Sequence, residues 1–182
     1  MMNIMNKKWY LPVIAFLIIG LAGCGSMQKT GDELVADSRD AKSAIEQDYP
    51  QFADLFETSA GYAIFPNVGK GAYIIGGSSG NGTVYENGNM IGYANLKELD
   101  VGLQAGGKAF VEVLFFENQQ ALEEFKRGTY ELGANASAVI LEEGISRDVD
   151  FQDGVAVLTM PKAGAMAGIS VGGQRFDFHP AE

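Results

Sequence analysis

The sequence predicts an α+β fold, with N-terminal amphipathic helices followed by a mostly antiparallel, Gly-rich β-sheet or barrel-like domain with one further helix. Apolar residues recur at helical spacing before residue 60, whereas short apolar runs alternate with glycine from Gly61 onward. The chain holds 24 glycines in 182 residues, which is typical of many tight turns. Asn87-Gly88 is the strongest hairpin signal, because a type I′ turn needs positive φ at both central positions. Helices followed by paired strands form an α+β domain.

Two helices are expected before the sheet. Thr30 and Glu33 form a capping-box pattern, and apolar residues from Asp32 to Asp48 share one helical face. Pro50 suits the first position of a second short helix, whose apolar face would hold Phe52, Leu55 and Phe56. An alternative is that the first helix lies on a membrane. Its polar face has an excess of acidic residues, the wrong sign for an anionic surface, so packing on the core is favoured. These acidic residues are Asp37, Asp40, Glu46 and Asp48, against Arg39 and Lys42.

The remaining elements are mostly short strands. We expect strands at residues 62–65, 72–75, 83–86, 89–93, 101–105, 109–116, 155–160, 165–171 and 174–178. The run 109–116 is apolar enough to be buried on both faces. Asn118 is expected to cap one helix that ends at Gly128, with its inner face made by Ala121, Leu122 and Phe125.

The N-terminus resembles that of a bacterial lipoprotein. Lys7 and Lys8 precede an apolar segment from Trp9 to Leu21, which spans about 20 Å as a helix and is short for the roughly 30 Å hydrocarbon core. Leu21-Ala22-Gly23-Cys24 then matches the lipobox pattern. We therefore expect a signal peptide at residues 1–23, a lipidated tether at 24–30 and a single domain at 31–182. The alternative is an ordinary signal peptide with a cysteine at the cleavage point by chance.

Lipidation of Cys24 would place the protein in the cell envelope. The lipoprotein resemblance implies an exported chain held to the membrane by palmitate-type acyl chains on Cys24, and two chains are enough for stable anchoring. Gly25 follows the cysteine where aspartate would signal inner-membrane retention. In a Gram-negative host, the expected place is the periplasmic side of the outer membrane.

Composition excludes several classes of function. The net charge of −10 opposes binding to nucleic acid, which depends on Lys and Arg neutralising phosphates. One cysteine cannot form an internal disulfide, and one histidine excludes the usual multi-histidine metal sites.

Several motifs resemble ligand sites only in part. Gly102–Ala109 approaches a Walker A loop, but an alanine stands where the magnesium-binding hydroxyl belongs and a strand follows. Gly77–Gly82 is expected to be a turn, with an anion nest as a distant alternative. Asp148, Asp150 and Asp153 suggest a calcium loop. Its twelfth position is Thr159 rather than glutamate, so a solvated turn is favoured.

The sequence offers no catalytic set. His179 is expected on the surface, because no nucleophile pattern lies near it. Glu123-Glu124 and Glu142-Glu143 are not placed across a cleft by any sequence signal. We therefore expect a protein that is not an enzyme and that binds neither a cofactor nor a metal.

Four basic residues remain as candidate contacts for a lipid head group. Lys70, Lys108, Lys162 and Arg175 each lie beside glycine or in a turn-rich context, where a cation could meet a phosphate. The alternative is ordinary surface charge, since the sequence does not cluster them.

Glycine-rich motifs recur along most of the chain. They are Gly61–Pro66, Lys70-Gly71, Gly76-Gly77, Gly80–Gly82, Val101–Gly107, Leu132-Gly133 and Lys162–Gly173. Together they resemble the motifs of the SYLF domain family. The resemblance covers residues 32–178 and implies a lipid-binding module. Eukaryotic members of the family bind phosphoinositides, some also bind actin filaments, and bacterial members are commonly exported or lipidated.

The resemblance implies a non-enzymatic ligand-binding role. Lys70 and Lys162 occupy motif positions and are the first expected contacts for a phospholipid or another amphiphile. Actin is not an expected partner, because the domain is acidic and a bacterial envelope holds none. The alternative function is a structural protein whose domain binds an envelope protein, with lipid serving only as the anchor.

Overall fold

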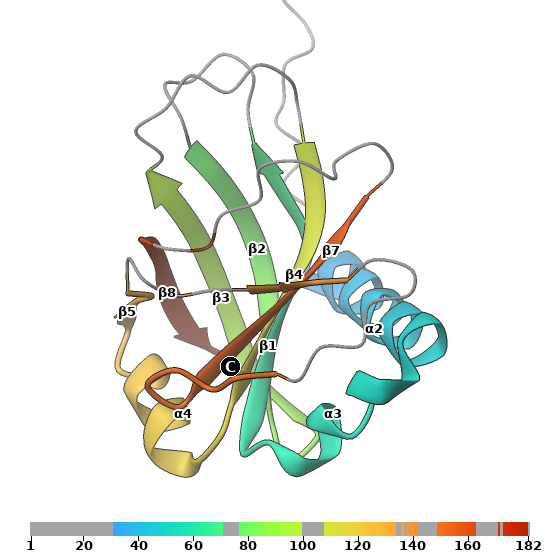
Figure 1. Ribbon diagram of the computed structural model, residues 1–182. Helices are drawn as coiled ribbons and strands as arrows, with labels where there is room; N and C mark the ends of the chain where they lie inside the picture. Colours follow the sequence, from blue (N-terminus) through green and yellow to red (C-terminus); the bar gives the residue numbers. More distant parts are fainter. Residues whose placement is uncertain are drawn as a thin grey trace, which may run out of the picture.

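The protein is a curled sheet with helices on both of its faces (Figure 1). This computed structural model describes residues 31–70, 77–99, 108–133, 136, 138–141, 149–162, 171 and 173–181. Its eight strands form one sheet in the order β5-β8-β3-β2-β1-β4-β7-β6. The sheet curls into an open half-barrel, with α2 and α3 on one side and α4 on the other (Figure 1).

The order of elements confirms the α+β class. The helices are α2 (Gly31–Asp48), the 3₁₀ helix η2 (Pro50–Phe52), α3 (Leu55–Thr58) and α4 (Gln119–Lys126). The strands are β1 (Gly61–Lys70), β2 (Gly77–Glu86), β3 (Asn89–Leu99), β4 (Lys108–Phe116), β5 (Thr129–Glu131), β6 (Ala138–Ile140), β7 (Val155–Pro161) and β8 (Gln174–Pro180). The β6–β7 pair is parallel, and the other described pairs are antiparallel.

The helical start of the domain differs in detail from the expectation. Helix α2 lies where the first helix was predicted, and its buried residues are Ser38, Ala41 and Ile45. A second short helix begins at Pro50 as predicted, but the structure divides the segment into the 3₁₀ helix η2 and the single turn of α3. The amide of Ala53 bonds to the carbonyl of Pro50 at 3.1 Å, a 3₁₀ geometry that tightens the chain before α3.

One end of the sheet is closed by a tight turn and by α4; we call it the turn end. Asn87 and Gly88 have φ values of 51° and 76°, which confirms the predicted type of hairpin. Asn118 caps α4 as predicted, since its Oδ1 accepts the amide of Ala121 at 3.1 Å. Gly128 follows the helix with φ of 120°. Local sequence signals therefore determine this end.

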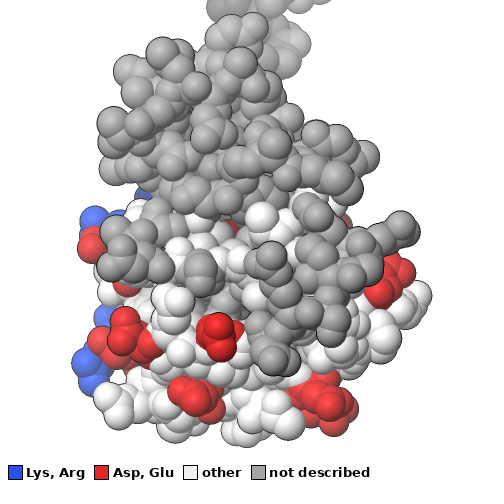
Figure 2. Space-filling view, in the orientation of Figure 1, with Lys and Arg blue, Asp and Glu red and all other residues white. Residues whose placement is uncertain are grey.

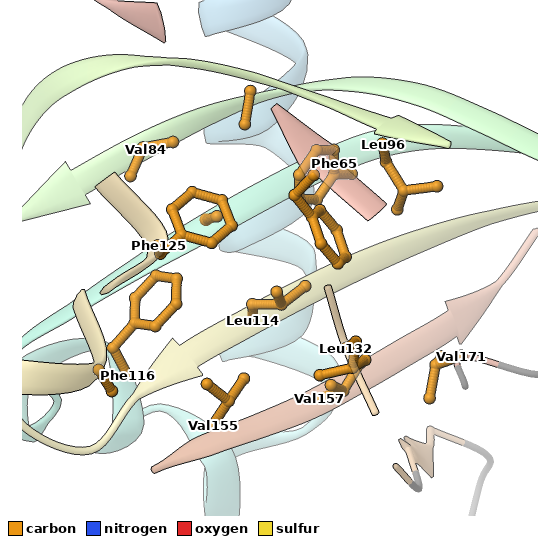
Figure 3. Packing of buried hydrophobic residues seen from close by; sticks show 14 of the residues in the cluster. Phe65, Val84, Leu96, Leu114, Phe116, Phe125, Leu132, Val155, Val157 and Val171 are labelled. Carbon is orange, nitrogen blue, oxygen red and sulfur yellow. The ribbon is translucent and has the colours of Figure 1, made fainter. Parts of the chain in front are cut away.

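Strand β4 is buried on both faces, as its apolar run predicts. One face, with Val111, Val113 and Phe115, packs beneath α2 and α3. The other face packs with α4 and with the inner sides of the neighbouring strands, and Figure 3 shows this cluster around Leu114, Phe116 and Phe125. The sheet thus separates two apolar clusters.

Several strands and turns differ from those that the sequence predicts. Gly77–Gly82 is not a turn, because these residues begin β2 and pair with Leu99–Ala94 of β3. At Gly82 a Cβ would lie 2.5 Å from the carbonyl oxygen of Ile64, so glycine serves close strand packing there. Strands β5 and β6 were not predicted. The strands predicted at 72–75 and 101–105, and all of 165–171 except Val171, lie outside the described residues.

Candidate functional site

Three of the four predicted basic residues meet at one end of the sheet, which we call the lysine end. Lys70 ends β1 and lies directly opposite Lys108, the first residue of β4. Lys162 follows β7, and its amide donates to the carbonyl of Ala109 at 2.9 Å. These three residues are far apart in sequence, and the antiparallel register of β1, β4 and β7 brings them together.

Arg175 lies elsewhere. It stands on β8, which β3 and β2 separate from β1, and its register partner on β3 is Lys97. Carboxylates lie near both side chains: Arg175 Nη1 is 3.8 Å from Glu131 Oε1, and Lys97 Nζ is 3.7 Å from Asp177 Oδ2. Local counter-charges therefore offset this basic pair, which makes Arg175 a weak candidate.

A pocket of about 250 Å³ opens between α2 and the lysine end; we call it the α2 pocket. Its charged and polar walls are Asp37 and Asp40 from α2, Asn67 from β1, and Lys162. Lys162 is exposed, and its Nζ makes a long hydrogen bond of 3.4 Å to Asn67 Oδ1. The pocket therefore presents a cation and carboxylates to the same space.

The remaining walls of the α2 pocket are apolar. Ala41, Pro66 and Val111 are buried, and Met160 is half-buried. Methylene groups could be accommodated against these side chains without loss of hydrogen bonds. The sequence missed the pocket, because Asp37 and Asp40 indicated only an acidic helix face, and only the packing of α2 on β1 brings them near Lys162.

A larger cavity of about 670 Å³, the α4 pocket, lies between α4, β5 and the turn that precedes β7. Glu124, Glu131 and Asp153 line it together with Tyr130 and Leu132. Burial raises the pKa of Tyr130, and the nearby charges of Glu124 and Asp153 add to this rise. On the face that Figure 2 shows, acidic side chains are spread over the described surface. The α4 pocket is therefore unsuited to an anion.

Glu112 is a buried carboxylate that no sequence motif singled out. Glu112 of β4 is fully buried, and Gln174 Nε2 donates to its Oε2 at 3.0 Å. Thr159, its register partner on β7, is also fully buried. The sequence signal that could have revealed this buried carboxylate is that one acidic residue, Glu112, interrupts the apolar run of residues 109–116.

Other candidate residues occupy structural positions. Asp153 and Gly154 form a tight turn with φ values of 52° and 77°, in line with the favoured turn, while Asp148 lies outside the described residues. His179 is exposed, as expected, and its Nε2 is 3.1 Å from Asn95 Nδ2. Glu123 accepts a hydrogen bond from Lys126 at 2.8 Å, and this bond is the main cause of its lowered pKa.

Neither a metal cluster nor a membrane span emerges from the described ranges. Within them, no group of three or more His, Cys, Asp or Glu residues has the placement of a metal site. None of the helices in these ranges combines the length and hydropathy that a bilayer span requires. Cys24, Glu142 and Glu143 lie outside the described residues.

Comparison with known families finds one match. Residues 97–181 match the model of the Ysc84 family, described as Las17-binding protein actin regulator. This stretch, just under half of the chain, is similar to the SYLF (Ysc84) family. The match confirms the resemblance drawn from the glycine-rich motifs, and it supports a lipid-binding or protein-binding domain. No curated protein matches the chain.

The SYLF match covers much of the candidate site. It runs from the end of β3 through β8 and therefore includes Lys108, Lys162 and Arg175. Lys70 and the acidic wall of the α2 pocket precede the matched residues. The lysine end thus joins strands within the matched part of the chain to β1, which lies before it.

Proposed function

We propose that this chain is a lipid-anchored protein of the bacterial cell envelope whose SYLF domain binds lipid head groups without catalysing a reaction. The acyl chains on Cys24 would hold the exported protein to the membrane. The domain would then bind the phosphate of a phospholipid or another amphiphile at the lysine end. We propose that the domain acts without a cofactor, a metal or nucleic acid.

The observation that carries the proposal is the cross-strand pair of Lys70 and Lys108. This backbone register brings two basic residues to one end of β1 and β4, where an anionic head group could bind. Lys162 extends the same basic group, because its backbone bonds to the residue that follows Lys108.

The net charge of the protein does not oppose such a site. Repulsion between the acidic domain and an anionic membrane is screened beyond about 8 Å at physiological salt. A local group of lysines can therefore contact a phosphate even when the whole protein carries a charge of −10.

The alternative role is protein binding, in line with the description of the matched family as a Las17-binding protein actin regulator. In that case the lipid would serve only as an anchor, and the domain would recognise another envelope protein. Actin is not an expected partner of an exported bacterial protein. The two roles differ in whether the domain itself recognises lipid.

The test is sedimentation of residues 26–182, which lack Cys24, with liposomes of varied charge at low and high salt. We expect saturable binding that weakens about fivefold or more in the double variant Lys70→Glu, Lys162→Glu, because charge reversal removes contacts to phosphate. Lys97→Glu is the matched control, since Lys97 already lies near Asp177. Circular dichroism verifies that each variant is folded.

Two outcomes would contradict the proposal. Equal binding by the wild type and the double variant would show that the lysine end does not recognise lipid. No binding to any liposome would make protein recognition the leading function of the domain.

A further inference from the structure

Lys162 and Asp40, which carry opposite charges, face the α2 pocket without pairing with each other. Lys162 and Asp40 are both exposed and line the same space of about 250 Å³. Within the described part of the chain, Lys162 and Asp40 form no ion pair with each other. Lys162 Nζ instead donates the long hydrogen bond to Asn67 Oδ1. A ligand with both a negative and a positive group could therefore satisfy both walls at once.

We propose that the α2 pocket binds the head group of a zwitterionic phospholipid with a primary amine, of the phosphoethanolamine type. The phosphate lies toward Lys162 and the ammonium toward Asp40. This inference rests on the proposed function, because it names the class of lipid that the lysine end takes.

The size and walls of the pocket suit a head group rather than a whole lipid. Cavities for drug-sized ligands usually hold about 300–1,000 Å³, whereas the α2 pocket holds about 250 Å³. Its buried apolar side, formed by Ala41, Pro66 and Val111, can contact the two methylenes between the phosphate and the amine. The acyl chains of such a lipid would remain outside the pocket.

The chemistry of the walls favours a primary amine over choline. Quaternary ammonium groups are recognised mainly by aromatic rings, and the described lining of the α2 pocket contains no aromatic residue. A primary ammonium instead donates up to three hydrogen bonds, and carboxylates are its strongest acceptors. Asp40 supplies such a carboxylate on the α2 side.

The same carboxylates disfavour a purely anionic head group. A phosphoglycerol head group would place its phosphate near Lys162 but would offer no cation to Asp40. Its negative charge would lie in the same small pocket as two carboxylates, where like charges repel. The pocket should therefore rank phosphoethanolamine above both phosphocholine and phosphoglycerol.

The test uses the full chain in a neutral maltoside detergent and three water-soluble probes. These probes are glycerophosphoethanolamine, glycerophosphocholine and glycerophosphoglycerol, and their binding is measured by calorimetry or by chemical-shift changes. We expect glycerophosphoethanolamine to bind about fivefold more tightly than the other two, the order of one charge-assisted hydrogen bond.

Two variants assign the two ends of the head group. Asp40→Asn should remove the preference for ethanolamine over choline, whereas Lys162→Met should weaken both phosphate ligands alike. Asp150→Asn is the matched control, because Asp150 is exposed and lies outside the α2 pocket. This control should bind the three probes as the wild type does.

Each other outcome overturns the inference and can be told apart from failure of the proposed function. Equal binding of the ethanolamine and choline probes, unchanged in Asp40→Asn, would leave lipid binding intact but remove the assigned head group. Tightest binding of glycerophosphoglycerol would assign an anionic lipid instead. Binding of none of the probes would overturn the head-group assignment, and the liposome experiment would then decide whether the domain binds lipid at all.

Discussion

Strand β1 begins in a tightly packed region and ends in an open one. At Gly61, on the turn end, a Cβ would lie 2.5 Å from the carbonyl oxygen of Tyr85 and 3.0 Å from a methyl group of Leu122. At Gly69, beside the lysine end, the described structure places nothing within 4 Å of a Cβ. One strand therefore contributes close packing at one end and free space at the other.

The two ends also differ in the chemistry of their side chains. At the turn end, Phe56 contacts both Tyr62 and Phe115, with ring centroids 5.0 and 4.9 Å apart. Burial raises the pKa of Tyr62 to about 12, and the neighbouring Tyr85 and Glu46 add to this rise. At the lysine end, charges gather around a pocket. This difference indicates that the turn end contributes close packing to the fold, and it agrees with the binding role proposed for the lysine end.

The largest expected change in stability follows from adding a methyl group at the turn end of β1, and the same addition at its other end serves as the comparison. Gly61→Ala should lower the free energy of unfolding by about 2–3 kcal/mol, because the methyl group must displace backbone and Leu122. Gly69→Ala should change it by less than about 0.5 kcal/mol. Urea unfolding followed by circular dichroism measures both. Similar losses in the two variants would refute the contrast in packing.

The next effect concerns the buried polar pair near the lysine end. Gln174→Leu removes the donor to Glu112 and should cost about 1–2 kcal/mol, since a buried carboxylate then loses a hydrogen bond. The same substitution in a Glu112→Leu background should cost less, and a double-mutant cycle of urea unfolding measures the difference. Additive losses would mean that this bond contributes nothing to stability.

Sequence signals predicted the turn end better than the two edge strands, β5 and β6, for a physical reason. The Asn87-Gly88 turn, the Asn118 cap and the apolar run of β4 each depend on neighbours in sequence. Strands β5 and β6 have three residues each and depend on pairing with β8 and β7, so no local pattern could define them.

The sequence predicted which basic residues belong to the candidate site, but it did not predict how they are arranged in space. Lys70, Lys108 and Lys162 were chosen from their sequence context, and only strand register brings them together. Arg175 has the same kind of context but lies across the sheet beside Glu131. The acidic wall of the α2 pocket depends on how α2 packs over β1, which periodicity in the sequence does not specify.

The smallest expected change in stability belongs to Lys162→Met. This substitution tests whether the lysine end acts in binding rather than in folding. Lys162→Met should alter the free energy of unfolding by less than about 0.5 kcal/mol, because Lys162 is exposed and its Nζ makes one long hydrogen bond. Asn118→Ala, at the turn end, should cost about 1 kcal/mol through loss of the α4 cap. Head-group binding should show the opposite order, with Lys162→Met weakened and Asn118→Ala unchanged at a temperature where both are folded. If binding instead followed stability across the two variants, the lysine end would have no role beyond the fold.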